Sequence, residues 1–160
     1  MKKFLYTAFM FFAMGATFVA CREDAETGLN PAEVDEQAQV AGTYEGEWMR
    51  VLDTDTIVEV GTLALVPTDS AWCVDVIVSC PAIGLDDGLK SVANIAKEAS
   101  YGFVFYNNST ENGLGANNFR GYVRYDADNN EIATINFVKT VKSGRKSYDY
   151  TFSFSGSLTE

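Results

Sequence analysis

The end of the chain alternates between apolar and polar side chains with a strict period of two residues. From residue 148 to residue 158, one parity is aromatic, aliphatic or glycine, and the other is small and polar. The two sets are Tyr148, Tyr150, Phe152, Phe154, Gly156 and Leu158, and Asp149, Thr151, Ser153, Ser155 and Ser157. This period indicates a β-strand with one buried and one solvated face, which is typical of antiparallel sheets. The chain is therefore predicted to bury its core beneath an antiparallel sheet.

Further strands are predicted along the rest of the chain, because clusters of Gly, Asn and Asp interrupt it about every ten residues. The predicted strands cover residues 43–52, 56–66, 70–79, 101–107, 119–126, 131–142 and 146–158. Short polar turns at 53–55, 128–130 and 143–145 join three pairs of strands into hairpins. A chain of 160 residues suffices for one domain of ordinary size. We expect a single all-β domain, either a sandwich or a barrel.

One segment favours a helix instead. In residues 87–100, Leu89, Val92, Ala93 and Ala96 have helical spacing and would share one face. The predicted strand 56–66 is apolar on both sides, so its outer face needs a cover. We expect the helix to provide that cover.

The N-terminal residues 1–20 read as a signal peptide, with Lys2 and Lys3 followed by an apolar stretch and then small residues. At a rise of about 1.5 Å per residue, the stretch 4–20 spans about 25 Å, short of the roughly 30 Å of a membrane core. Phe18-Val19-Ala20-Cys21 resembles a bacterial lipobox of the relaxed kind typical of Bacteroidetes lipoproteins. The resemblance implies that Cys21 becomes the first mature residue and carries the lipid.

The segment that follows Cys21 is acidic. Arg22-Glu23-Asp24-Ala25-Glu26 resembles the signal that exports Bacteroidetes lipoproteins to the outer face of the outer membrane. Residues 21–40 have few aliphatic side chains and cannot bury enough apolar area to fold alone, so we expect a flexible tether. The resemblance implies a protein anchored by lipid in the outer membrane and facing the cell exterior, with its folded domain at 41–160.

The opening of that domain carries a second resemblance. Residues 41–48, AGTYEGEW, look like the first strand of the calycin-like, or lipocalin-like, barrels of Bacteroidetes surface lipoproteins, and residues 152–156, FSFSG, resemble the ending of those domains. Gly46-Glu47-Trp48 also matches the G-x-W motif of lipocalins, in which the tryptophan closes the barrel floor. The resemblance implies an up-and-down barrel of about eight strands that binds a small apolar ligand.

The candidate ligand-lining residues are the aromatic side chains expected to point into the barrel: Tyr44, Trp48, Tyr148, Tyr150, Phe152 and Phe154. The alternative is that these side chains fill the interior, because an eight-stranded barrel is only wide enough for side chains or one small ligand. Gly46 and Gly156, also expected to face inward, favour some free space. Both interpretations remain open at this point.

Charge and composition exclude several functions. Without Lys2 and Lys3, the remaining 10 basic and 22 acidic residues give a formal charge of −12, which repels nucleic-acid phosphates. The chain has no histidine, the commonest general base and zinc ligand. Asp126, Asp128 and Asn130 fit a polar turn better than a calcium loop, which needs glycine where Glu131 stands. We therefore expect no enzymatic activity, cofactor or metal, and no nucleic-acid partner.

Three smaller features leave alternatives open. Cys73 and Cys80 would lie on opposite faces of one strand, so we expect free thiols. The basic cluster Lys139, Lys142, Arg145 and Lys146 fits either an exposed strand edge or a patch for anionic sugars or lipid head groups. Thr56 and Ser70 fit a loose pattern for Bacteroidetes O-glycosylation.

Two functions remain compatible with the sequence. The first is non-catalytic binding of a small apolar or amphipathic ligand inside the barrel or at its mouth. The second is an interaction module that contacts a protein or glycan through its loops. The Asn- and Gly-rich loop 107–118 is the candidate contact for the second function.

Overall fold

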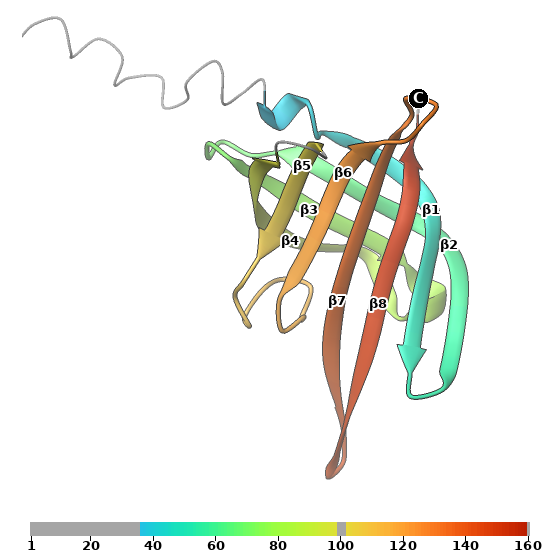
Figure 1. The fold of residues 1–160 in the computed structure, drawn as a ribbon. Helices are drawn as coiled ribbons and strands as arrows, with labels where there is room; N and C mark the ends of the chain where they lie inside the picture. The colour runs from blue at the N-terminus through green and yellow to red at the C-terminus, as the bar shows by residue number, and fades with distance from the viewer. Residues whose placement is uncertain (1–35, 99–101, 160) are drawn as a thin grey trace, which may run out of the picture.

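The computed structural model describes residues 36–98 and 102–159 (Figure 1). The expected signal peptide, Cys21 and most of the expected tether lie outside these ranges. Within them, no helix is both long enough and apolar enough to cross a membrane.

Eight antiparallel strands form one closed up-and-down barrel (Figure 1). Each strand pairs with the next along the chain, and β8 closes the ring by pairing with β1. One 3-10 turn, η1 (Pro81–Ile83), connects β3 to β4. The strands are β1 (Gly42–Leu52), β2 (Asp55–Pro67), β3 (Cys73–Cys80), β4 (Leu85–Glu98), β5 (Gly102–Asn107), β6 (Phe119–Tyr125), β7 (Glu131–Ser143) and β8 (Lys146–Leu158).

The structure confirms all seven strands expected from alternation, with ends that differ by at most three residues. It also confirms the three hairpins. Each turn contains a residue in the left-handed region, Asp53, Asn129 or Gly144, and these are the residue types that tolerate this conformation. Turn chemistry and alternation together therefore fix most of the barrel.

The helix expected at 87–100 is wrong, because this segment forms β4 between β3 and β5. The segment also alternates with a period of two: Ser91, Ala93 and Ile95 are buried, whereas Val92 is half exposed. Hydrogen bonding to a strand on each side outweighs a weak helical pattern, because local propensity is a small term beside tertiary pairing. Without β4 the ring would not close.

The loss of the helix leaves the outer face of β2 uncovered. On this face, Val58 and Val60 are 51% and 77% exposed, and Val66 is 42% exposed. The expected cover for this strand is therefore wrong as well. β2 pairs with β3 only from Thr62 to Pro67, so residues 55–61 also form an open edge.

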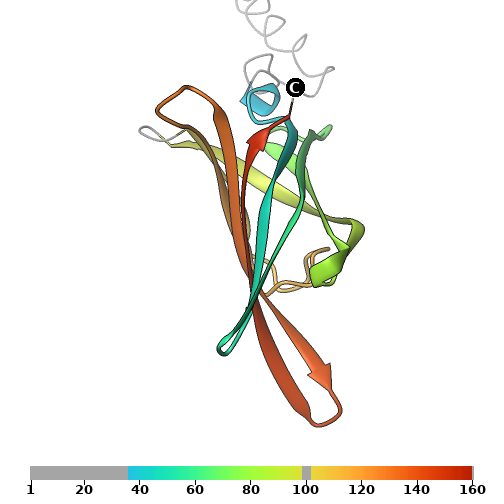
Figure 2. The same cartoon turned by 90° about the vertical axis from the view of Figure 1, so that its right-hand side faces the viewer.

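Two long hairpins extend beyond the closed part of the barrel (Figure 2). One is β1–β2, and the other is β7–β8, whose pairing continues to Ser143 and Lys146. β6 pairs with β7 only as far as Phe137, so the outer part of the β7–β8 hairpin has no strand beside β7. The barrel thus has a short-stranded side and a side that projects past the ring.

The barrel interior is filled by side chains. Trp48, Phe137, Phe152 and Phe154 form an aromatic cluster at its centre, and all four are at most 3% exposed. The ring centroids of Trp48 and Phe154 are 4.9 Å apart, and those of Phe137 and Phe152 are 5.1 Å apart. Leu114 from the loop between β5 and β6 is also fully buried. Of the inward aromatic residues expected from the sequence, Tyr44, Trp48, Phe152 and Phe154 are buried, whereas Tyr148 and Tyr150 are half-buried.

The described N-terminal residues pack against the end of the barrel opposite the β7–β8 tip (Figure 1). Gln37 and Val40, from the segment expected to be a tether, are buried. The Gln37 Nε2 group donates to the carbonyl oxygen of Ser70 at 2.6 Å, and Lys97 pairs with Glu36 at 3.4 Å. The folded part of the chain therefore extends at least to residue 36.

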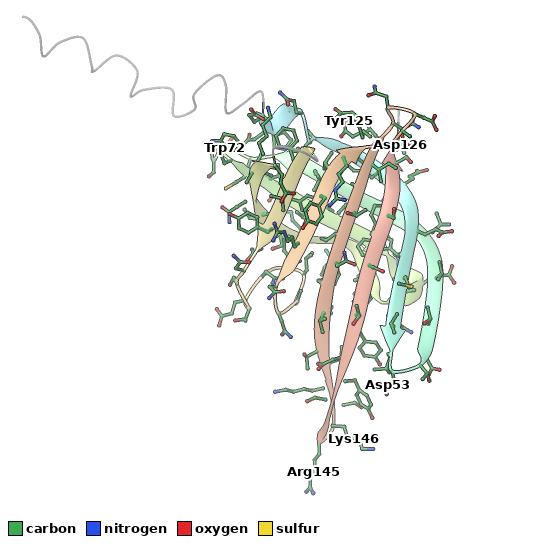
Figure 3. The ribbon with its side chains drawn as sticks, in the orientation of Figure 1. Asp53, Trp72, Tyr125, Asp126, Arg145 and Lys146 are labelled. Atoms are coloured by element: carbon green, nitrogen blue, oxygen red, sulfur yellow. The ribbon has the colours of Figure 1, made fainter. Side chains whose placement is uncertain are left out.

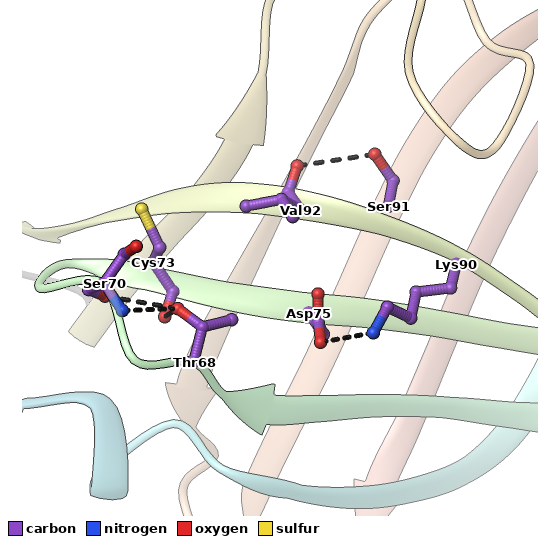
Figure 4. A network of polar contacts seen from close by, with 7 residues as sticks. All are labelled: Thr68, Ser70, Cys73, Asp75, Lys90, Ser91 and Val92. Atoms are coloured by element: carbon purple, nitrogen blue, oxygen red, sulfur yellow. Dashed lines mark hydrogen bonds and ion pairs between the residues drawn. The ribbon is translucent and has the colours of Figure 1, made fainter.

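The β2–β3 connection that receives Gln37 is itself held by side chains (Figure 4). The Thr68 hydroxyl donates to the carbonyl oxygens of Ser70 and Cys73 at 3.2 and 3.1 Å. On the neighbouring strands, Lys90 forms an ion pair with Asp75 at 2.6 Å. These contacts fix the end of the barrel at which the described chain begins.

Candidate ligand-binding site

A cavity of about 220 Å³ opens at the end of the barrel from which the β7–β8 hairpin projects. It combines residues from β1, from η1 and its C-cap, and from both strands of the hairpin. The lining residues are Arg50, Ile83, Gly84, Lys139, Val141, Tyr150 and Phe152. Five of these residues are uncharged and two are cations, and no acidic side chain lines the cavity.

Strand register explains why these residues meet. Arg50 on β1 and Phe137 on β7 each pair with Phe152 on β8, so the three lie side by side across the sheet. Two residues further along the hairpin, Lys139 pairs with Tyr150. Because side chains alternate along a strand, all these positions belong to the inward face. At these positions the inward face is aromatic where the ring closes and carries cations where the hairpin leaves it.

Arg50 is held by two contacts at the cavity wall. Its Nη1 group donates to the carbonyl oxygen of Ile83 at 3.0 Å, and its guanidinium carbon lies 5.3 Å from the centroid of the Tyr150 ring. The side chain is half-buried. Among the described residues no carboxylate pairs with it, since the ion pairs there involve Lys90, Lys97 and Arg120. Arg50 is therefore a positioned cation with unused hydrogen-bond donors.

Lys139 is the second cation of the cavity. It is half-buried and lies beside Gly115, in the loop between β5 and β6. If Gly115 were replaced by alanine, the added Cβ atom would lie 3.9 Å from the Lys139 Nζ atom. Lys139 also forms no ion pair with a described residue. Two uncompensated cations over an apolar floor give this cavity a positive potential on a chain whose formal charge is −10.

The structure brings two of the six expected ligand-lining residues to the cavity, Tyr150 and Phe152. Trp48 and Phe154 lie in the aromatic cluster behind Phe152 and have no exposed surface of note. Tyr148 is half-buried on the projecting hairpin. Only the part of the expected set near the hairpin can therefore meet a ligand in this structure.

Tyr44, the remaining expected residue, is fully buried near the opposite end of the barrel. Its hydroxyl donates to the Glu131 carboxylate and to the carbonyl oxygen of Val40, at 3.1 Å for the latter. Burial, reinforced by Glu131, raises the pKa of Tyr44 well above its usual range. The negative charge of Glu131 also raises the pKa of Tyr125. Tyr44 therefore ties the N-terminal segment to β7 and does not line the cavity.

The two inward glycines do not create space for a ligand. Gly46 and Gly156 pair with each other where β1 meets β8. A Cβ atom on Gly156 would lie 2.5 Å from the carbonyl oxygen of Glu45 and 2.5 Å from the Phe154 ring. The glycines allow the two closing strands and this ring to approach, so the expectation of free space there is wrong.

Arg50 was missed as a site residue by the sequence reasoning, although a signal was present. It stands two residues after Trp48 and therefore shares the inward face with it. A cation at an inward position of an otherwise apolar face is costly unless it has partners or a function. Lys139 was noticed only as part of a basic cluster, because its face could not be separated from those of its neighbours without the register.

The other candidate sites have less support as binding sites. Asp126 accepts hydrogen bonds from the backbone of Asp128 and Asn130 at 2.9 and 2.8 Å, so its carboxylate already stabilises a turn. Cys73 and Cys80 lie on opposite faces of β3, and both are free thiols. Within residues 36–98 and 102–159, no three His, Cys, Asp or Glu side chains gather closely enough to hold a metal ion.

Comparison of the chain with protein-family models, curated proteins and solved structures finds no match. The lipocalin-like family label therefore stays a prediction from sequence. The closed eight-stranded barrel itself follows from the strand pairing. The function of the cavity is therefore inferred from the residues that line it.

Proposed function

We propose that this chain is a lipid-anchored surface lipoprotein whose lipocalin-like barrel binds a small apolar or amphipathic ligand without catalysis. The observation that carries the proposal is the cavity at the barrel mouth, whose apolar walls include two cations without carboxylate partners. Concave, mostly apolar sites with a few polar groups are the usual form of small-molecule sites. The ligand binds at the mouth because the aromatic cluster occupies the interior.

The arrangement of the barrel fits an anchor at Cys21. The described chain enters the barrel at one end, and the cavity lies at the other, near the hairpin tip that bears Arg145 and Lys146 (Figure 3). A lipid at Cys21 would therefore connect to the end of the barrel opposite the cavity, which leaves the cavity mouth free of the attachment point. Thr56 and Ser70 are exposed, so glycans at these positions are sterically compatible with export.

Anchoring and exposure are testable in cells. Metabolic labelling with an alkyne-bearing fatty acid should mark the wild type, and Cys21→Ala should abolish the label. Protease added to intact cells should degrade the domain of the wild type. Protection of the domain until the cells are lysed would contradict the surface location.

Ligand binding is tested by native mass spectrometry of protein purified gently from its own membrane after proteolytic removal of the anchor. We expect a discrete adduct that denaturation removes. Val141→Trp should fill the cavity and abolish the adduct, because Val141 lines it and is 40% exposed. Val92→Trp is the matched control, since Val92 is half exposed on β4, away from the cavity. A bare polypeptide mass, even after incubation with fatty acids and small lipids, would contradict the proposal.

The second candidate, an interaction module for a protein or glycan, has one observation in its favour. Met49, Val58 and Val60 form an exposed apolar strip on the β1–β2 hairpin, beside the open edge of residues 55–61. Exposed apolar strips and open edges are typical of contact surfaces. The loop 107–118 is less suited to an adaptable contact, because Leu114 and Ala116 anchor it in the core.

A photo-crosslinking residue in place of Val60 tests this second candidate on intact cells. A single crosslinked species that disappears with Val58→Lys would support the interaction module. Absence of any crosslinked species, together with a ligand adduct in the mass spectrum, would leave ligand binding as the function.

A further inference from the structure

We propose that the ligand of this cavity carries a carboxylate, which binds between Arg50 and Lys139, and an apolar part that follows the inner face of the projecting β7–β8 hairpin. This inference rests on the proposed function and narrows it to one chemical class, a small carboxylate amphiphile. It does not follow from a barrel fold alone, because the site lies outside the filled interior.

The first step is the state of Arg50. One of its donors is satisfied by the carbonyl oxygen of Ile83, and one face of the guanidinium lies toward Tyr150. These contacts fix the orientation of the planar group and leave the edge formed by Nε and Nη2 without an acceptor among the described residues. Such an edge matches the two oxygens of a carboxylate. The two contacts thus orient the guanidinium group before any ligand binds.

The second step is the neighbourhood of the two cations. Two positive charges that line one small cavity repel each other, and no lining carboxylate compensates them. A buried or half-buried charge is costly unless it is paired. A ligand anion placed between Arg50 and Lys139 removes this cost, whereas a neutral ligand does not. The chain elsewhere carries an excess of acid, so the cavity is a local exception to its charge.

The third step is size and polarity. A volume of about 220 Å³ equals that of roughly seven water molecules. This space accommodates a carboxylate and a few carbon atoms, and Ile83, Val141 and Phe152 supply apolar contacts for the carbons. A multiply charged or fully hydroxylated ligand would leave polar groups against these walls. The lining therefore favours an amphiphile over a sugar acid.

The fourth step is the path out of the cavity. On the inner face of the hairpin, the pair Lys139–Tyr150 is followed by Val141–Tyr148 and then by Ser143–Lys146. Tyr148 is half-buried and Val141 is 40% exposed, so an apolar surface continues from the cavity toward the tip. The segment 139–148 contains no acidic residue. A ligand tail too long for the cavity can therefore lie along Val141 and Tyr148 without meeting negative charge.

The test is titration calorimetry of the full-length lipoprotein in nanodiscs, with empty nanodiscs as the blank. The probes are octanoate, its neutral counterpart 1-octanol, and glucuronate as a carboxylate without an apolar tail. We expect octanoate to bind at least about tenfold more tightly than 1-octanol, since a hydrogen bond to a charged group carries this difference. Glucuronate should bind more weakly than octanoate.

Two variants of equal charge change separate the role of Lys139 from a general loss of positive charge. Lys139→Gln should weaken octanoate binding about tenfold and should weaken 1-octanol binding much less, because only octanoate carries a charge that pairs with Lys139. Lys142→Gln is the matched control, because Lys142 has the opposite parity on the same strand, is exposed and does not line the cavity. It should change octanoate binding less than about twofold. Thermal unfolding of both variants checks that the barrel is intact.

The outcomes distinguish this inference from the proposed function. Equal binding of octanoate and 1-octanol, or an unchanged octanoate affinity in Lys139→Gln, would overturn the carboxylate and leave ligand binding in place. Glucuronate binding more tightly than octanoate would overturn the amphiphile in favour of an acidic sugar. Binding of none of the three probes would count against the inference and against the proposed function together.

Discussion

Replacing Tyr44 by Phe removes a single hydroxyl from the end of the barrel at which the described chain begins. The hydroxyl is fully buried and donates to the Glu131 carboxylate and to the carbonyl oxygen of Val40. A hydrogen bond to a charged group contributes about 1.5–3 kcal/mol, and the phenyl ring retains the packing of the tyrosine ring. We therefore expect Tyr44→Phe to lower the free energy of unfolding at pH 8 by about 2 kcal/mol.

The same substitution should lose its effect in alkali. The pKa of Tyr44 is raised in the folded state, from a usual value of 10.0, because burial and Glu131 disfavour the phenolate. This contribution to stability is complete below pH 10 and is lost as the pH rises further, since only the unfolded chain then releases the proton. The loss is about 1.4 kcal/mol per pH unit, so the wild type and the variant should become equally stable near about pH 11.5.

Urea denaturation followed by tryptophan fluorescence at pH 8 and pH 11.5 measures both quantities. Tyr106→Phe is the control, because Tyr106 is half exposed and its hydroxyl forms no hydrogen bond with the described residues. We expect it to change stability by less than about 0.5 kcal/mol at pH 8. A stability difference for Tyr44→Phe that stays constant from pH 8 to pH 11.5 would refute the buried, protonated hydroxyl.

Three further predictions concern stability and reactivity. Gly156→Ala should lower the free energy of unfolding by about 3 kcal/mol, measured by urea denaturation, because its Cβ would strike the Glu45 carbonyl and the Phe154 ring. The Cys80 thiol should resist a thiol reagent at pH 8 until urea unfolds the barrel, since burial chiefly raises its pKa, whereas early reaction would contradict that burial. Hydrogen bonds from Asn130 foremost lower the pKa of Asp126, so Asp126→Asn should destabilise the barrel at pH 7. This difference should shrink as the pH falls below about 4, where the unfolded chain takes up its proton, and vanish once the pH is also below the lowered pKa of the folded Asp126. A difference that persists after the folded carboxylate is protonated would contradict it.

Alternation was sufficient to predict most of the fold, because a barrel strand has one buried face and leaves a period of two in the sequence. Val74, Val76 and Val78 on β3, and Phe152 and Phe154 on β8, are buried as expected. The positions of the three hairpin turns were also predictable, because few residue types adopt the left-handed backbone conformation that these turns contain. These are local properties, and local sequence determines them.

The segment that became β4 shows where local reasoning ends. Leu89, Val92, Ala93 and Ala96 satisfy a helical period, whereas Ser91, Ala93 and Ile95 satisfy a period of two. Ser91 is a weak signal for a buried position, yet its hydroxyl accepts a hydrogen bond from the backbone of Gly113 at 3.3 Å. Ser91 can lie on the inner face because the distant loop that contains Gly113 packs against it and supplies this hydrogen bond. The choice between the two periods was therefore made by tertiary contacts.

The candidate site was predictable only in part, for a similar reason. The sequence identified the inward aromatic residues of β8. It did not show which of them are buried and which reach solvent, because this depends on how far the closed ring extends along each strand. The ring ends near Phe137 on β7, where pairing with β6 stops. Tyr150 and Tyr148 lie beyond this point and escape full burial. No pattern within β8 marks that boundary.

The basic residues of the β7–β8 hairpin divide by the direction in which they face. Lys142 and Arg145 are exposed at the projecting end, where cations protect an open strand edge against pairing with other chains. Edge protection does not account for Lys139 or for Arg50, because both face the cavity and are half-buried. A cation that serves only solubility would be expected on the outer face, in water. The two half-buried cations of the cavity are therefore the part of the charge pattern that supports the proposed binding of an anionic ligand, and the apolar floor formed by Phe152 favours a ligand with an apolar part.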